Sequence, residues 1–412
     1  MSEETILIVG AGHAGVQAAV RLREVEWGGR VVLIDPDGHV PYERPPLSKD
    51  FLKHGASDDV PPLRRDGYYQ EKGIELVAAR AARINPVQRR VLLATGAELG
   101  YTKLILAPGS AARTLTVPGA ELAGIHQLKT REDALALKQS LVPGARVAII
   151  GAGYIGLEVA AAAAALGCET TVLEFQDRVM SRVTSGPVSR FFEQLHGAHG
   201  TRFVFGAAVT EIRGEGKVEE IVTADGTVYP ADVVVAGIGV VPLEGLAAQA
   251  GLHTEDGVVV DADSRTSDPH IYAAGDATRL ICAEEGISRR LESIQSAVAQ
   301  AIDAANHIMG ATAAQREVPW FWTIQHGVRL QTAGLRHPDD DVVVRGDAGT
   351  APFSVLYLRD GRLSAIDTIG SLKDFTQGKK LIAAGAAVDP RLAADPTIKL
   401  ADAVRDLVAE RS

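Results

Sequence analysis

The start of the chain alternates between strand-like and helix-like hydrophobic patterns. An apolar run at Thr5–Val9 predicts a buried strand, and the small and apolar residues of Val16–Arg23 predict a helix. A second apolar run, Arg30–Asp35, predicts another strand. Strands that are buried on both faces read as continuous apolar runs of this kind. We therefore expect the chain to begin with a β-α-β unit of a parallel sheet.

The same pattern occurs again further along the chain. Apolar runs at Arg146–Ile150 and Glu169–Glu174 predict strands, and the alanine-rich stretch Leu157–Leu166 predicts the helix between them. This pair of units is the one internal repeat that we find in the sequence.

Glycines follow the first strand of both units at the same spacing. Residues 10–15 read GAGHAG, and residues 151–156 read GAGYIG. Such glycines allow a tight turn, close approach of the backbone to a pyrophosphate, and close packing of helix on strand. The second strands end in acids, Asp35 and Glu174, which can accept hydrogen bonds from an adenosine ribose. One such glycine pattern can be merely a turn, but two in this full context indicate two bound dinucleotides, one passing electrons to the other.

Shorter elements are expected between and after the two units. Pro45 and Pro46 force an extended segment, after which Ser48 is expected to cap a short helix. Strands are expected at Gly73–Val77, Arg90–Leu93, Leu104–Gly109, Arg202–Phe205, Val209–Arg213, Lys217–Thr223, Val233–Gly239, Gly257–Asp261 and Ile271–Asp276. Helices are expected at Thr130–Leu141, Gly186–Leu195 and Gln295–Met309.

The pattern changes at Val318, where a tryptophan-rich segment begins. Strand-like runs follow at Arg329–Ala333, Asp341–Arg345, Phe353–Leu358 and Leu363–Ile369, and helices are expected at Leu372–Ala384 and Leu400–Glu410. We therefore predict an α/β fold with two Rossmann-like dinucleotide-binding domains and a C-terminal α+β domain. The expected domains are residues 1–113 with 244–317, residues 114–243, and residues 318–412.

Composition and charge exclude several classes of protein. Hydrophobic residues make up 46% and charged residues 23%, which is typical of globular proteins. The formal net charge of −10 argues against nucleic-acid binding. No uncharged apolar run is long enough to span a membrane. The early strand leaves no room for a signal peptide, so we expect a cytoplasmic protein.

The two cysteines, Cys168 and Cys282, lie far apart in the sequence. Without a paired cysteine motif, a zinc site, an iron–sulfur cluster and a dithiol centre are all disfavoured. We therefore expect no metal site, and both cysteines are expected to pack as small apolar residues in a reducing compartment.

Several motifs, taken in order, point to a known family. They occupy residues 9–15, 41–49, 149–158, 271–276, 291–295 and 319–322. Over nearly its whole length, the chain resembles the FAD-dependent NADH:ferredoxin reductases of bacterial oxygenase systems, the family of putidaredoxin reductase and biphenyl dioxygenase ferredoxin reductase. The resemblance implies a glutathione-reductase-like arrangement, with FAD in the first domain and NADH in the second.

The resemblance also implies the reaction. NADH is expected to transfer a hydride to the flavin, and electrons are then expected to pass singly to a [2Fe–2S] ferredoxin. This ferredoxin would feed a cytochrome P450 monooxygenase or a ring-hydroxylating dioxygenase.

The same resemblance assigns residues to FAD. Arg44 is expected near the phosphates, Asp276 at the ribityl chain and Trp322 at the flavin ring, although a surface ion pair and a core aromatic are the alternatives for Arg44 and Trp322. The full expected set is Gly10, Gly12, His13, Ala14, Gly15, Asp35, Arg44, Pro45, Lys49, Ala81, Ala107, Gly109, Arg113, Asp276, Glu292, Ser293, Ile294 and Trp322.

A second set is expected around NADH. It comprises Gly151, Gly153, Tyr154, Ile155, Gly156, Glu158, Glu174, Arg182 and Gly239. Arg182 is equally explained as a solvated side chain. Glu174 would repel a 2′-phosphate and bind a 2′-hydroxyl, and the residues after it form no basic cluster, so NADH is predicted over NADPH.

Lys49 and Glu158 are the predicted catalytic pair. By the resemblance, they should meet beside the flavin and the nicotinamide, where a lysine stays charged if a carboxylate accompanies it. The alternative is a surface lysine and a glutamate that caps a helix.

The expected ferredoxin is acidic, so a basic docking face is predicted. Its candidates are Arg289, Arg290, Arg316, Arg329, Lys373, Lys379 and Lys380. The protein is expected to be a monomer or a weak homodimer. One departure from the family is Ile324, which stands where relatives usually carry Asp or Asn and which cannot form a hydrogen bond.

Two other functions remain open from the sequence. An enzyme of the same fold could reduce rubredoxin, a quinone, monodehydroascorbate or oxygen instead of a ferredoxin. A protein like apoptosis-inducing factor could use the fold for redox-sensitive interactions.

Overall fold

The computed structural model describes residues 4–53, 57–282, 286–311 and 317–405. It divides into two compact units. Unit 1 comprises Met1–Glu43, Val60–Ala111 and Val240–Arg316, and unit 2 comprises Arg44–Asp59, Ala112–Gly239 and Glu317–Ser412. The predicted boundaries of three domains stay a prediction.

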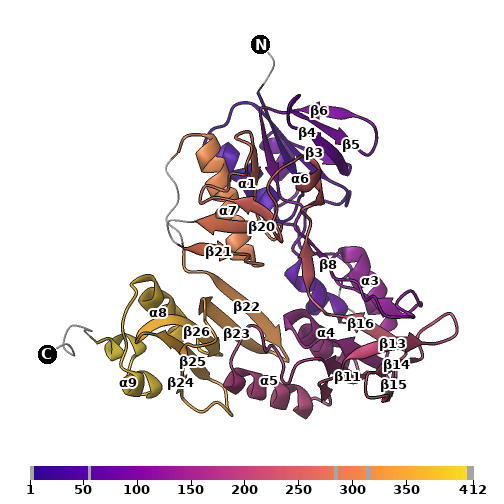
Figure 1. Cartoon of the computed structure of the whole chain (residues 1–412), viewed down its shortest axis with the longest axis vertical. Coiled ribbons are helices and arrows are strands. Elements are labelled where there is room, and N and C mark those ends of the chain that lie inside the picture. Colours follow the sequence, from indigo (N-terminus) through magenta and orange to yellow (C-terminus); the bar gives the residue numbers. More distant parts are fainter. Residues whose placement is uncertain (1–3, 54–56, 283–285, 312–316, 406–412) are drawn as a thin grey trace. The chain divides into compact units, whose positions relative to one another are not determined.

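Unit 1, in which Figure 1 labels strand β3, is built on a five-stranded parallel sheet of order β19-β7-β1-β2-β3. Its strands are β1 (Thr5–Val9), β2 (Arg30–Asp35), β3 (Ile74–Ala78), β7 (Lys103–Leu106) and β19 (Ile271–Ala273). Helices α1 (His13–Glu24) and α7 (Ile294–Ile308) cover one face, where alanines let the two helices pack closely. Because both faces of the sheet are buried, its strands read as continuous apolar runs.

The opposite face of this sheet packs against smaller elements. These include the antiparallel sheet β4 (Ala81–Asn85), β5 (Arg90–Leu93) and β6 (Glu98–Gly100), helix α6 (Gly245–Gln249), and strands β18 (Val258–Val260) and β20 (Thr278–Cys282). Strand β21 (Ile287–Arg289) pairs with β20, strand β17 (Val240–Pro242) pairs with β8 (Ser110–Ala112), and α2 (Tyr68–Glu71) precedes β3.

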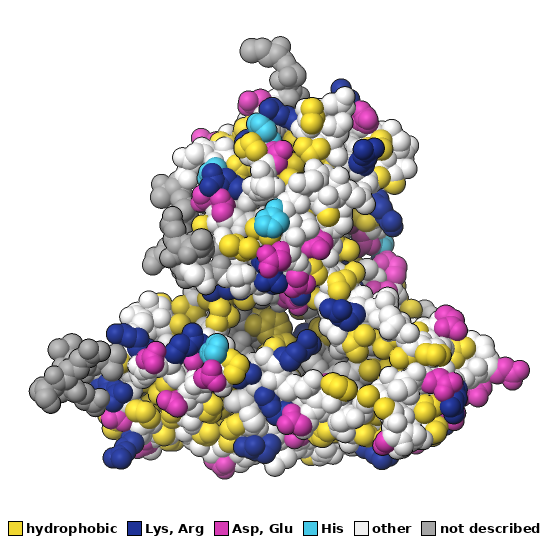
Figure 2. Space-filling model, in the orientation of Figure 1, with side chains coloured by type: hydrophobic (Ala, Val, Ile, Leu, Met, Phe, Trp, Pro, Cys, Tyr) yellow, Lys and Arg dark blue, Asp and Glu magenta, His cyan; other side chains and the backbone are white. Residues whose placement is uncertain are grey.

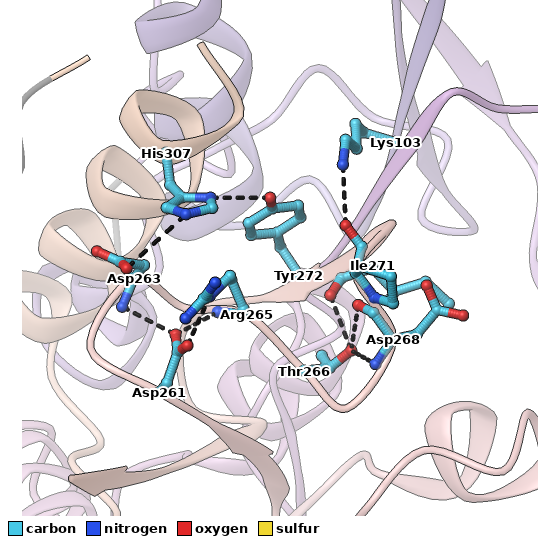
Figure 3. A network of polar contacts seen from close by, with 10 residues as sticks. Lys103, Asp261, Asp263, Arg265, Thr266, Asp268, Ile271, Tyr272 and His307 are labelled. Atoms are coloured by element: carbon cyan, nitrogen blue, oxygen red, sulfur yellow. Dashed lines mark hydrogen bonds and ion pairs between the residues drawn. The ribbon is translucent and has the colours of Figure 1, made fainter. Parts of the chain in front are cut away.

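A network of polar contacts surrounds β19 at the edge of the parallel sheet (Figure 3). The Tyr272 hydroxyl lies 3.0 Å from Nδ1 of His307, and the Thr266 hydroxyl donates to the carbonyl of Ile271 at 2.8 Å. The Lys103 ammonium donates to the carbonyl of Pro269. The Tyr272–His307 contact joins β19, which precedes Asp276, to α7, which Ser293 caps.

Unit 2 contains a second five-stranded parallel sheet, of order β12-β11-β10-β16-β9. Its strands are β9 (Ile125–His126), β10 (Arg146–Ile150), β11 (Glu169–Glu174), β12 (Arg202–Phe205) and β16 (Val233–Ala236). In both parallel sheets the strand before the glycines is central and the strand ending in the acid is its neighbour. The associated helices are α3 (Arg131–Ser140), α4 (Tyr154–Ala165) and α5 (Gly186–Ala198), and β13 (Val209–Arg213), β14 (Glu220–Thr223) and β15 (Val228–Pro230) form a separate antiparallel sheet.

The last part of unit 2 is an antiparallel sheet of order β22-β23-β26-β25-β24. The strands are β22 (Trp320–Gln325), β23 (Val328–Gly334), β24 (Asp341–Arg345), β25 (Phe353–Arg359) and β26 (Arg362–Ile369). Helices α8 (Leu372–Ala383) and α9 (Pro390–Ala394) and a 3-10 turn, η4 (Leu400–Ala403), follow. Two short 3-10 turns, η1 (Pro45–Ser48) and η2 (Asp50–Leu52), also belong to unit 2.

Both repeated β-α-β units are confirmed, but other predicted elements are wrong. The helices after the glycines begin at His13 and Tyr154, earlier than predicted, because the third glycine lies inside the first helical turn. Ser48 caps no helix: it ends η1, and its hydroxyl binds a carboxylate. The predicted helix at Leu400–Glu410 is only the turn η4, which Val404 leaves in an extended conformation; residues 406–410 lie outside the described part.

A buried acid in unit 2 makes stability depend on pH. Asp367 accepts hydrogen bonds from Thr184 and Tyr357, yet burial raises its pKa from 3.8 to about 6. The folded state therefore binds this proton more tightly than the unfolded chain does. This contribution to stability is present at low pH and is lost as the pH rises from about 4 to about 6.

We expect Asp367→Asn to remove that loss. The unfolding free energy of the variant relative to the parent should rise between pH 4 and pH 7, by up to about 3 kcal/mol. Denaturant unfolding at a series of pH values measures it, with Asp402→Asn at an exposed position as the control for charge. A difference that stays constant with pH would contradict the prediction.

Candidate functional site

The glycine turn of unit 1 leaves no room for side chains at two of its positions. Gly10 has a φ of +102°, and a Cβ placed there would lie 2.0 Å from the carbonyl oxygen of Ala107. A Cβ on Gly15 would lie 1.8 Å from the carbonyl oxygen of Gly10. Any other residue at these positions would push the backbone apart, so the turn requires glycine.

The turn of unit 2 repeats this geometry. Gly151 has a φ of +101°, and a Cβ there would lie 2.5 Å from the carbonyl oxygen of Gly237. A Cβ on Gly156 would lie 2.2 Å from the carbonyl oxygen of Gly151. A Cβ on Gly153, in contrast, would meet no described atom within 4 Å. The middle glycine therefore faces open space, into which a phosphate could fit.

The two acids bind the turns in the same way. Asp35 accepts from the backbone N–H of Ala11 at 2.6 Å through Oδ2, and from Asp37 through Oδ1. Glu174 accepts from the N–H of Ala152 at 2.6 Å through Oε2, and from Gln176 through Oε1. Each carboxylate oxygen has lone pairs left for further donors. The acids thus stand beside the phosphate cradles and can still accept ribose hydroxyls.

The described residues of both cradles fit a dinucleotide. Neither α1 nor α4 has a side-chain cap or an acid in its first turn among these residues. The first N–H groups of each helix are therefore available to an anion, and the helix dipole favours negative charge there. A pyrophosphate needs this combination of a glycine turn and a free helix N-terminus.

Unit 1 contains most of the residues predicted for FAD. His13 contacts Glu43, the Ser110 hydroxyl donates to Asp276 at 3.1 Å, and Glu292 pairs with Arg290. Ser293 caps α7, which begins at Ile294. Ala81 begins β4, Ala14 lies buried in α1, and Ala107 and Gly109 follow β7.

Unit 2 contains the other residues of the two predicted sets. The Arg44 guanidinium donates to the carbonyl of Lys129, and Pro45 begins η1. The N–H of Arg113 donates to the carbonyl of Gly239, close to the Arg182 guanidinium. Helix α4 begins with Tyr154 and Ile155. The side chain of Ile155 is exposed, whereas burial raises the pKa of Tyr154. The Tyr154 ring lies 4.6 Å from that of Phe321, next to Trp322.

Lys49 and Glu158 meet inside unit 2. The Lys49 ammonium lies 2.8 Å from Oε2 of Glu158, a residue only 3% exposed. The Ser48 hydroxyl donates to the same oxygen at 2.5 Å, and the Thr323 hydroxyl donates to Oε1 at 2.6 Å. The contact rules out the alternative of an unpaired surface lysine and a capping glutamate. It forms a buried carboxylate with three donors, one of them a cation.

Sequence reasoning missed Ser48 and Thr323 as partners of Glu158. Ser48 precedes the predicted lysine, but its contact depends on a turn that the sequence did not predict. Thr323 lies on β22, which begins with three aromatic residues and therefore shows no alternating strand pattern at its start. The useful signal was the alternation that follows: Thr323 and Gln325 point to one face of β22, and Trp322 and Ile324 to the other. The side chain of Ile324 therefore lies on the same face of β22 as Trp322, and not on the face that contacts the Glu158 carboxylate.

Cys168 is buried as a free thiol, and burial raises its pKa, as predicted for a packing residue. In the part of the chain that the structure describes, every helix is too short or too polar to cross a membrane.

Known proteins are similar to this chain in both sequence and fold. Residues 4–301 match the model of the pyridine nucleotide-disulphide oxidoreductase family, and residues 320–404 match that of the reductase C-terminal domain. A 5,5'-dehydrodivanillate O-demethylase ferredoxin reductase subunit of Sphingobium sp. is 43% identical and aligns over 94% of this chain and 95% of its own. A rubredoxin-NAD(+) reductase of Pseudomonas putida is 39% identical over 88% of this chain and 95% of its own.

A solved structure agrees with these matches. The reductase in the covalent putidaredoxin reductase–putidaredoxin complex superimposes with a TM-score of 0.93, at 36% identity, over 96% of this chain and 97% of its own. The predicted fold class and family resemblance are thereby confirmed. The chain belongs to the pyridine nucleotide-disulphide oxidoreductase family and carries a reductase C-terminal domain.

Proposed function

We propose that this protein is an NADH:ferredoxin oxidoreductase that binds FAD in unit 1 and NADH in unit 2. The observation that carries the proposal is the same dinucleotide cradle built twice, with a glycine turn, a free helix N-terminus and an acid in each. The two cysteines are too far apart in the sequence to form the motif of a disulfide reductase. Electrons from NADH therefore need a flavin and an external acceptor.

The residues of the chain bind and orient, while the cofactor supplies the redox chemistry. When bound, FAD can accept two electrons from a nicotinamide and release them one at a time. Asp35 and Glu174 select the two riboses. Lys49, held by Glu158, would supply a positive charge that stabilises the negative charge gained by a bound flavin on reduction. The step needs no acid or base from the protein.

The acceptor that we propose is an acidic [2Fe–2S] ferredoxin. Charged side chains of both signs are interspersed on the face drawn in Figure 2, so docking relies on a local basic cluster. In unit 2, Arg329, Lys373 and Lys380 are exposed, whereas Lys379 pairs with Glu317. In unit 1, Arg290 pairs with Asp256 and Glu292, and Arg289 also has a partner. Arg316 lies outside the described residues.

An anaerobic stopped-flow experiment tests this function. We expect NADH to bleach the flavin band rapidly. Reduction of an added ferredoxin should follow, and its rate should fall as salt is added. Absence of bleaching would overturn the enzyme proposal and favour a redox-sensitive interaction protein. A cytoplasmic location and a monomer or weak homodimer belong to the same proposal.

A rubredoxin is the second candidate acceptor. It is favoured by the rubredoxin-NAD(+) reductase at 39% identity, since the cofactor sites would be the same for either partner. Bleaching by NADH without transfer to a ferredoxin, but with transfer to a rubredoxin, would select it.

Glu174 should decide between NADH and NADPH. We expect Glu174→Ala to lower kcat/KM for NADH about tenfold, because a hydrogen bond to a charged acceptor is lost, and to raise it for NADPH. Steady-state kinetics with both nucleotides measure the change, and Glu169→Ala, on the exposed start of the same strand, is the matched control. An unchanged preference would show that Glu174 does not contact the ribose.

A further inference from the structure

A chain of hydrogen-bonded side chains leads away from the Lys49–Glu158 pair. Nε2 of Gln325 lies 3.3 Å from the Thr323 hydroxyl, whose own proton points to Glu158. Oε1 of Gln325 lies 2.9 Å from Nε2 of His196, and Nδ1 of His196 lies 3.3 Å from Nε2 of His326. Two side chains, Thr323 and Gln325, thus connect the carboxylate to the histidine pair His196 and His326 in the same unit.

The fold holds this chain in place. Thr323, Gln325 and His196 are each 0% exposed. His326 and Gly327 form the two-residue turn between β22 and β23, and both have positive φ, as tight hairpins of the I′ type require. The ring of His199 stacks on His326 at 3.9 Å and closes the end of the chain.

The partners determine where each hydrogen lies. Thr323 has one proton, and donating it to Glu158 leaves the hydroxyl oxygen as the acceptor for the Gln325 amide. The carbonyl oxygen of Gln325 then faces His196, which must donate through Nε2–H. His196 accepts at Nδ1, so His326 donates in turn. Every donor in the chain therefore points toward Glu158.

A chain with the opposite direction is also consistent with these positions. His196 would then donate through Nδ1–H, the Gln325 amide would turn over, and Thr323 would donate to Gln325 instead of Glu158. The carboxylate would lose one of its three donors. The negative charge of Glu158, paired with Lys49, favours the first direction because a carboxylate accepts and does not donate.

We propose that Gln325 and His196 are positioning residues that direct the Thr323 hydroxyl at Glu158 and thereby hold this carboxylate in the geometry that orients Lys49. The inference rests on the proposed function of the Lys49–Glu158 pair. His196 must be neutral to accept at Nδ1, and burial lowers the pKa of His196 and of His326 to about 4 each. The titratable groups that face them are each other and His199.

The tautomer of His196 tests the direction of the chain without measuring activity. Histidine-selective ¹⁵N NMR of the FAD-bound protein at neutral pH, with the His196 signals assigned by their loss in His196→Gln, should show an Nε2–H and a bare Nδ1. An Nδ1–H tautomer, or a charged ring, would overturn the proposal. This result does not depend on whether NADH reduces the protein.

Kinetics test the positioning role. Thr323→Val and Gln325→Met should each slow flavin reduction by NADH about tenfold with little change in the Kd for NADH, and Thr323→Ser should restore the rate. Thr368→Val is the matched control, since Thr368 is an equally buried threonine that donates to the carbonyl of Gln331. Flavin content and the unfolding midpoint verify that each variant is folded.

The outcomes separate the two proposals. Unchanged rates in folded Thr323→Val or Gln325→Met, or an equal loss in Thr368→Val, would overturn the positioning role. If the parent protein itself is not bleached by NADH, the proposed function fails, while the His196 tautomer still decides the direction of the chain.

Discussion

Replacing Lys49 by methionine is expected to slow the reduction of bound FAD by NADH by about a hundredfold or more. The substitution keeps the length of the side chain and removes its charge. Glu158 then remains buried with two neutral donors, Ser48 and Thr323, and without its cation. The site loses both the positive charge that favours reduction and the geometry of the carboxylate. Anaerobic stopped-flow absorbance at the flavin band measures the rate.

A double variant separates these two losses. Lys49→Met with Glu158→Leu leaves no buried charge unpaired, so its unfolding free energy should exceed that of Lys49→Met alone. The rate of flavin reduction by NADH should stay low. Recovery of the rate in the double variant would show that the lysine charge is not needed. The matched single control is Lys53→Met, an exposed lysine whose pairing with Asp50 contributes little to stability.

Replacing Arg345 by methionine should lower the unfolding free energy of the C-terminal sheet and its helices by about 3–5 kcal/mol. Arg345 is only 3% exposed and lies 3.1 Å from Asp374. Its guanidinium also donates to the carbonyls of Ala393, Asp395 and Ile398, which joins α9 and the turn after it to β24. Methionine fills part of the space but leaves the carboxylate and three carbonyls without these donors.

Urea unfolding followed by tryptophan fluorescence measures this effect, because Trp320 and Trp322 lie in the same sheet. Arg213→Met is the control: its ion pairs with Glu211 and Glu220 are exposed, and their loss should change the unfolding free energy little. Equal midpoints for the Arg345 and Arg213 variants would show that the buried cluster does not hold this part of the chain together.

The local features of the nucleotide cradles were predictable from the sequence. The glycines, the helix and the acid of each cradle lie within one β-α-β unit, so their spacing alone indicates their arrangement. The structure adds the reason for the first and third glycines, which is contact with the carbonyls of Ala107 and Gly10 in one turn and of Gly237 and Gly151 in the other. The helix predicted at Leu400–Glu410 failed because its apolar spacing reflects packing of a short turn against the sheet.

By itself, the sequence determined the α/β class, the two glycine cradles and the family resemblance, and it predicts a preference for NADH, since each depends on residues close together in the chain. The tertiary structure decided which distant side chains meet. Lys49 and Glu158 are 109 positions apart, and Thr323 and Glu158 are 165 apart. Thr323, Gln325 and His196 are polar yet fully buried. A hydrophobic pattern assigns such residues to the surface, because only their hydrogen-bond partners, which folding brings together, offset the cost of burying them.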